Sequence, residues 1–124
     1  MQIVDANIIL RYLLKDIEEL HTKAVQIVEN KEIHIPFEVI AEVVYVFEKI
    51  YEVPRLEIKD ALSTLLNYPN ITTSNVDILF EALQIYEKQK IDFVDSLLVS
   101  YNHIQKDTIY SFDKKLNKLL GQQL

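Results

Sequence analysis

Four acidic residues occupy positions from which they could act on one substrate. Asp5 and Asp113 each follow a segment typical of a strand, while Glu42 and Asp95 each lie at the polar margin of an amphipathic helix. Hydrolysis of a phosphodiester near neutral pH needs charge stabilisation at the phosphate and an activated water. Carboxylates alone would repel that substrate. Held around one or two Mg²⁺ or Mn²⁺ ions, they make the site electropositive and lower the pKa of bound water.

Strands and helices that alternate along the chain would position these acids. The pattern predicts strands at residues 2–4, 32–35, 70–73 and 108–111. It predicts helices at residues 6–14, 37–51, 76–89 and 92–105. Two further helices are expected to begin at Asp16, as an N-cap, and at Pro54, the latter ending near residue 68. A basic helical segment follows Asp113. Such alternation favours parallel strands with right-handed crossovers and helices on both faces.

The two helices that carry Glu42 and Asp95 each have an apolar side. In the helix at 37–51 the apolar arc runs on to Ile50 and Tyr51, and Glu42 lies just outside its edge. In the helix at 92–105 we expect one side to be apolar, Val94 included, and the other to carry the polar residues Asp92, Asp95, Ser96, Asn102 and His103. Because ligand sites of open parallel sheets lie outside the carboxyl ends of the strands, we expect Glu42, Asp95 and Asp113 to be brought to Asp5.

Composition narrows the class of protein. With 124 residues, 49% hydrophobic and 26% charged, the chain is typical of one soluble globular domain, residues 1–124. The lack of cysteine excludes disulfides and thiolate zinc sites, and a single glycine argues against phosphate-binding glycine loops. The net charge of -6 argues against a non-specific duplex binder, although bound metal ions would offset it locally. We find no secretory signal and no membrane span, so we expect a cytoplasmic protein.

The chain resembles the PIN-domain ribonucleases, specifically toxins of the VapC type. The matching segments are Ile3-Val4-Asp5-Ala6-Asn7, Glu42 in the third helix, Asp92-Phe93-Val94-Asp95-Ser96-Leu97-Leu98, and Tyr110-Ser111-Phe112-Asp113. The resemblance implies a three-layer α/β/α sandwich with a central parallel sheet of four or five short strands; the fifth strand is doubtful, because residues 119–124 are barely long enough for it. It also implies Asp5, Glu42, Asp95 and Asp113 as metal ligands, with Asn7 and Ser111 as polar supports. It further implies that RNA is the substrate, that a cognate antitoxin is a partner and that the protein forms a homodimer.

Each of these residues also has a simpler interpretation. Asp5, Asp92 and Asp113 could be helix N-caps, and Asp92 is the less favoured choice for the third acid of the family. Asp95 could be a favourable charge in a first helical turn, and Glu42 an exposed residue at the edge of its helix. Asn7 and Ser111 could satisfy nearby backbone groups. The lysines at 114, 115 and 118 are most simply a solvated face, with RNA contact as the alternative.

We therefore expect a ribonuclease that depends on Mg²⁺ or Mn²⁺. In this hypothesis Asp5, Asp95 and Asp113 bind the metal, and Glu42 completes the shell or orients water. A second hypothesis is a PIN-like module that binds RNA or protein without cleaving. A phosphatase or another metal hydrolase would use the same oxygen ligands, and only the order of the motifs speaks against it.

Overall fold

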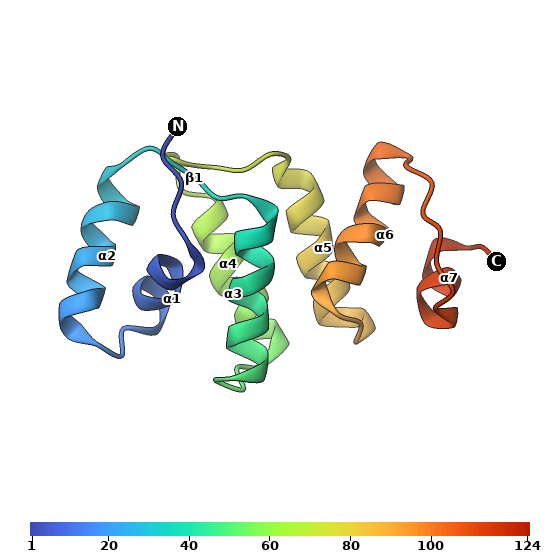
Figure 1. Cartoon of the computed structure of the whole chain (residues 1–124), viewed down its shortest axis with the longest axis horizontal. Helices are drawn as coiled ribbons and strands as arrows, with labels where there is room; N and C mark the ends of the chain where they lie inside the picture. The colour runs from blue at the N-terminus through green and yellow to red at the C-terminus, as the bar shows by residue number, and fades with distance from the viewer. The chain divides into compact units, whose positions relative to one another are not determined.

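The computed structural model describes all residues 1–124. The chain divides into two compact units, Met1–Val76 and Asp77–Leu124. Figure 1 shows the elements of both units. The first unit contains α1 (Ala6–Leu14), α2 (Glu18–Asn30), β1 (Ile33–His34), α3 (Phe37–Lys49), α4 (Arg55–Leu66) and β2 (Ile71–Thr72). The second contains α5 (Val76–Gln89), which begins at the junction, then α6 (Phe93–Gln105) and α7 (Lys114–Leu120).

The first unit carries a small parallel sheet. β1 pairs with β2, with Ile33 opposite Ile71. Ile3 forms an isolated parallel bridge to His34, whose N–H donates to the Gln2 carbonyl at 2.8 Å. Residues 2–4 therefore extend alongside β1, and the expected parallel direction of the first three extended segments is confirmed. A sheet of four or five strands is not confirmed, since two strands and this one bridge are formed.

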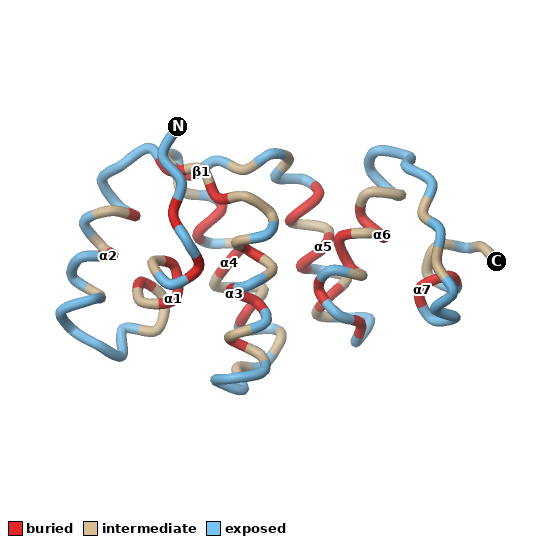
Figure 2. Tube along the Cα trace, in the orientation of Figure 1, coloured by how far each residue is buried: buried red, intermediate tan, exposed pale blue.

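The helices of the first unit pack against one another and bury apolar side chains that recur at helical spacing. α1 packs against α2 and α3, and α3 packs against α4. Ile9, Val28, Ile40 and Leu62 are each fully buried. Figure 2 shows buried segments of α1, α3 and α4 in red. Pro36 and Pro54 are the N-caps of α3 and α4. A fixed proline φ suits a helix start, so both expected starts are confirmed.

Two details of the first unit differ from expectation. Asp16 is not the N-cap of α2, which is Ile17; its carboxylate instead accepts two hydrogen bonds from Arg11, at 2.8 and 2.9 Å. A charged partner on the preceding helix outcompetes a backbone cap. The apolar arc of α3 also stops early, because the helix ends at Lys49 and leaves Ile50 66% exposed and Tyr51 41% exposed.

The second unit is built on its own contacts between helices. The Ser100 hydroxyl of α6 donates to the Ile78 carbonyl of α5 at 2.9 Å, and the rings of Tyr86 and Phe93 meet edge to face. Ile91, Val99 and Leu116 form a buried apolar cluster that joins α6 to α7. The core of this unit thus combines apolar packing with the hydrogen-bonded, buried hydroxyl of Ser100.

The expected division of α6 into apolar and polar sides is wrong at two positions. Ser96 is fully buried, and its hydroxyl donates to the Asp92 carbonyl one turn earlier at 3.1 Å. A serine that bonds back to its own helix hides its polar atom, so it can face a core. Val94, expected on the apolar side, is 57% exposed.

Residues 106–113 connect α6 to α7 without regular structure, so the strand expected at 108–111 is not formed. Side-chain amides occupy carbonyls that a strand would offer to a neighbour. Gln122 Nε2 donates to the Ile109 carbonyl and Asn117 Nδ2 to the Ser111 carbonyl, both at 2.7 Å. The doubtful strand at 119–124 is also absent, because α7 runs to Leu120 and ends at Gly121 in the left-handed region. No helix has both the length and the apolar character needed to cross a membrane.

Candidate active site

Asp5 lies where the first extended segment passes into α1. Its backbone is extended, and its Oδ1 accepts a hydrogen bond from the Ile8 N–H at 3.2 Å, so Asp5 is the N-cap of α1. A carboxylate is favourable there because the helix dipole is positive at this end. The side chain is exposed and its Oδ2 has no hydrogen bond within the unit. Capping by one oxygen therefore leaves the other available to a ligand.

Glu42 and Asn7 are the other candidate residues of the first unit. Glu42 is exposed on α3 beside the buried Val43, as its place at the edge of the apolar arc suggested. Asn7 is exposed on the first turn of α1, two residues after Asp5. Because α1 packs against α3, Asp5 and Glu42 belong to neighbouring helices.

Two carboxylates of the second unit, Asp92 and Asp113, act on a third, Asp95. Asp95 lies in the first turn of α6, where burial, followed by the negative charges of Asp92 and Asp113, raises its pKa above the ordinary value. Both neighbours are therefore close enough to Asp95 to disfavour its ionised form. A cation held among these groups would relieve that repulsion.

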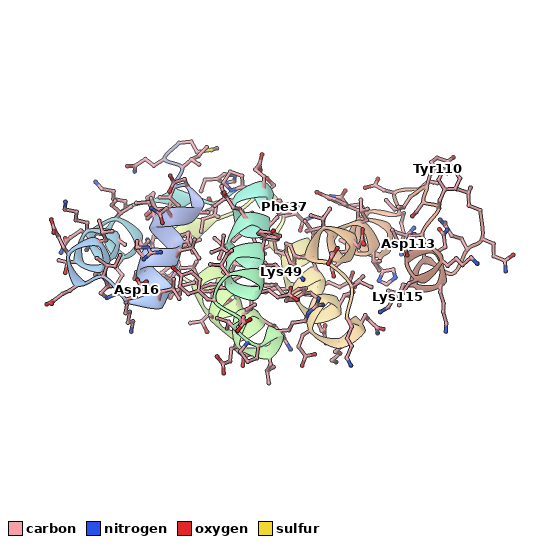
Figure 3. All side chains as sticks on the ribbon, turned by 60° about the horizontal axis from the view of Figure 1, so that its bottom comes forward. Asp16, Phe37, Lys49, Tyr110, Asp113 and Lys115 are labelled. Carbon is pink, nitrogen blue, oxygen red and sulfur yellow. The ribbon has the colours of Figure 1, made fainter.

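Asp92 and Asp113 make different local contacts. Asp92 occupies the N-cap position of α6, but its side chain makes no capping bond; its carbonyl accepts the Ser96 N–H at 2.9 Å. Asp113 caps α7 with its side chain, because its Oδ1 accepts the Leu116 N–H at 2.8 Å. Asp113 is exposed and can be seen in Figure 3. Asp5 and Asp113 thus have the same local structure: each has an extended backbone and caps the helix that follows it.

The residues around Asp113 fix its backbone. The Ser111 hydroxyl accepts the Asp113 N–H at 2.9 Å, so Ser111 does hold the main chain at this acid. Asn117, only 7% exposed, donates to the Ser111 carbonyl and accepts from Gln122 Nε2 at 2.9 Å. Asn117 was not among the residues expected from the sequence. The sequence feature that could have indicated it is a single amide residue between Leu116 and Lys118, four residues after the N-cap acid Asp113.

The donors present suit a hard divalent cation. They are carboxylate oxygens, and there is no cysteine in the chain; oxygen donors favour Mg²⁺ or Mn²⁺ over softer metals. Neither unit by itself gathers three or more His, Asp or Glu side chains into a group that could hold an ion.

Comparison with known proteins identifies the family. The PIN domain family matches residues 3–120, which is nearly the whole chain. The chain belongs to the PIN domain family. It is 27% identical over 124 residues to a VapC ribonuclease of Aquifex aeolicus (strain VF5), which covers 96% of this chain and 92% of the relative. No solved structure matches. The resemblance noted in the sequence is confirmed, and this PIN domain is α/β with a small parallel sheet.

Proposed function

We propose that this PIN domain is a metal-dependent ribonuclease, the toxin of a toxin-antitoxin pair. The observation that carries the proposal is the position of Asp95 near Asp92 and Asp113: burial and these two negative charges raise the pKa of Asp95, and a divalent cation would relieve the repulsion. The match to the PIN family and the similarity to a VapC ribonuclease support the choice of RNA as substrate.

The proposed site uses the four acids that the sequence singles out. Asp5, Asp95 and Asp113 would hold Mg²⁺ or Mn²⁺, and Glu42 would complete the shell or orient the attacking water. The ion would neutralise charge on the scissile phosphate and lower the pKa of a bound water. Asn7 and Ser111 support the geometry, Ser111 through its bond to the Asp113 N–H. The capping bonds at Asp5 and Asp113 fix each carboxylate through one oxygen, which limits the conformational entropy lost on metal binding.

The finer fold in this proposal is a three-layer sandwich whose sheet has four or five parallel strands. Residues 2–4 bridge to β1 on one side, and Ile3 is 57% exposed. Residues 108–111 are rich in strand-forming side chains, and Tyr110 is 81% exposed.

The proposal includes an antitoxin and a second copy of the chain as partners. Apolar side chains remain exposed on and around α3 and α4, and they suit a homodimer surface: Tyr45, Ile50, Tyr51 and Leu56. Sedimentation of the purified protein tests this surface. A dimer that becomes a monomer in Tyr45→Glu, with α-helical content unchanged, is the expected result.

Cleavage of a mixed RNA pool tests the activity directly. The purified chain is incubated with Mn²⁺ and with EDTA, beside Asp95→Asn and the control Asp60→Asn, an exposed acid of α4 outside the proposed site. We expect cleavage only with Mn²⁺, its loss in Asp95→Asn and its retention in Asp60→Asn. Cleavage by Asp95→Asn at the wild-type rate would refute the assigned role of Asp95.

The second candidate, a PIN-like module that binds without cleaving, makes a different prediction. Its acids would serve charge or structure, so Mg²⁺ or Mn²⁺ would leave thermal unfolding unchanged. The repulsion at Asp95 favours the metal-binding alternative, because a bound cation would relieve it. A rise in Tm with Mn²⁺ that Asp95→Asn abolishes would count against the non-catalytic module.

A further inference from the structure

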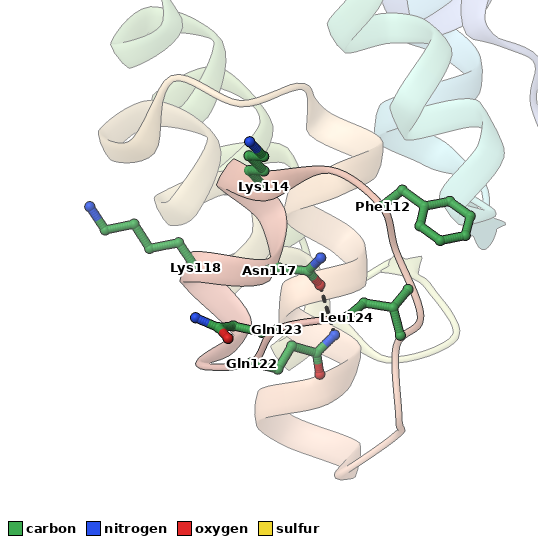
Figure 4. A pocket seen from close by; sticks show the side chains of 7 residues that line it. All are labelled: Phe112, Lys114, Asn117, Lys118, Gln122, Gln123 and Leu124. Carbon is green, nitrogen blue, oxygen red and sulfur yellow. Dashed lines mark hydrogen bonds between the residues drawn. The ribbon is translucent and has the colours of Figure 1, made fainter.

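A pocket of the second unit lies beside Asp113. It has a volume of about 510 Å³ and is bounded by α7, the end of the connecting segment and the C-terminal residues. Figure 4 shows the ring of Phe112 on one side, and Lys114 and Lys118 projecting from α7. Asn117 and Gln122 form its floor through their mutual hydrogen bond. The pocket therefore has an aromatic wall, a cationic wall and a rigid polar base.

The charge of the pocket is opposite to that of the whole chain. The chain carries a net charge of -6, yet two lysines and no acidic residue line this hollow. The ammonium groups of Lys114 and Lys118 make no salt bridge or hydrogen bond, whereas the neighbouring Lys115 donates to the Lys90 carbonyl at 3.1 Å. Lys114 and Lys118 are thus the cations of α7 that remain available to an anionic ligand.

The aromatic side chains at this place are unusually exposed. Phe112 is 94% exposed and Tyr110, labelled in Figure 3, is 81% exposed. The main chain that carries them is held by the amides of Asn117 and Gln122, so the backbone beneath the rings is fixed. An aromatic face on a fixed backbone, next to lysines, is the arrangement by which proteins hold unpaired bases and their phosphates.

We propose that this pocket binds a single-stranded segment of RNA. A base stacks on Phe112, and the flanking phosphates contact Lys114 and Lys118. Because Phe112 and Lys114 directly precede and follow Asp113, the bound strand passes the proposed metal site. The proposal rests on the proposed ribonuclease function for its choice of ligand, but it concerns binding alone and names residues outside the metal-binding acids.

Fluorescence anisotropy with a labelled single-stranded RNA in EDTA tests the proposal, since no metal is then available for cleavage. Phe112→Ala should weaken binding by about five- to a hundredfold, the effect of losing one base stack. Lys118→Ala should lower the dependence of log affinity on log salt by about 0.7. Lys115→Ala is the matched control, because it removes one positive charge from the same helix outside the pocket. It should change affinity less than Lys118→Ala.

Equal RNA affinity in the wild type, Phe112→Ala and Lys118→Ala would overturn the proposal and leave the pocket as a surface for a protein partner. Equal losses in Lys115→Ala and Lys118→Ala, with none in Phe112→Ala, would also overturn it, since only diffuse charge attraction would remain. Failure of the ribonuclease function gives a separate result. The wild type would then not cleave with Mn²⁺, while Phe112→Ala would still weaken binding.

Discussion

Two substitutions at Asp113 separate its capping role from its proposed metal-binding role. Its Oδ1 accepts the Leu116 N–H at 2.8 Å, so Asp113→Ala loses an N-cap, which costs about 1 kcal/mol. For a chain of this length that lowers Tm by about 4 °C. Asp113→Asn keeps a capping oxygen, because asparagine caps as well as aspartate. It also removes a charge that repels Asp95, so its stability without metal should match or slightly exceed that of the wild type.

The two roles diverge when metal is added. Mn²⁺ at a hundred times its Kd should stabilise the wild type by about 2.7 kcal/mol, whereas both variants should gain far less. The assay is urea unfolding followed by circular dichroism, with EDTA and with Mn²⁺. Asp107→Asn is the control, because it removes an exposed acid of the same unit that caps no helix. If Mn²⁺ stabilised Asp113→Asn as much as the wild type, Asp113 would be a cap alone and the reasoning would be refuted.

Three further predictions concern residues with defined contacts. The folded state raises the pKa of Asp95, so its charge costs stability above the ordinary aspartate pKa; Asp95→Asn should therefore stabilise the metal-free protein at neutral pH. That gain should shrink as pH falls through the raised pKa, and unfolding free energies that differ by the same amount at all pH values would contradict it. Asn117→Ala should lower the free energy of unfolding in urea by about 1 to 3 kcal/mol, because it leaves the Ser111 carbonyl unpaired. It should also lower RNA cleavage by displacing Asp113. Unchanged stability and cleavage would argue against that positioning role. Tyr12→Phe should cost about 1 kcal/mol by the same measurement, since the hydroxyl donates to Glu29 at 2.7 Å, and an unchanged value would show that this bond has no net effect.

Local sequence signals predicted most of the helices. Prolines 36 and 54 mark the starts of α3 and α4, and the helix expected at 76–89 has those bounds in α5. These signals succeed because a proline's φ and a period of 3.6 residues act within one or two turns. They failed at Asp16, whose partner Arg11 lies on the preceding helix, and at Ile50, where the apolar period outlasts the helix.

The strand expected at 108–111 illustrates the limit of strand propensity. Strand-forming residues indicate only that a segment fits a sheet, and a strand exists when a neighbouring edge accepts its backbone. In the second unit, amides from Asn117 and Gln122 bond two carbonyls of this connection. Neither amide could be assigned from sequence, because each acts through a turn that becomes visible only in three dimensions.

The candidate acids were predicted unevenly. The positions of Asp5 before α1 and of Asp113 before α7 were predicted from an acid that follows a strand-like segment. The geometry is compatible both with helix capping and with metal binding by these two acids. The interaction of Asp95 with Asp92 follows from helical spacing, whereas its interaction with Asp113 depends on how α7 packs against α6. The binding of one ion by all four acids stays a prediction.

Calorimetric titration of Mn²⁺ into the wild type, Asp5→Asn and Asp95→Asn tests that claim most directly. In the proposed site Asp5 and Asp95 bind the same ion, so either substitution should weaken binding by at least about tenfold, a loss of 1.4 kcal/mol. Wild-type affinity in Asp5→Asn, with the loss confined to Asp95→Asn, would contradict a site that these acids share.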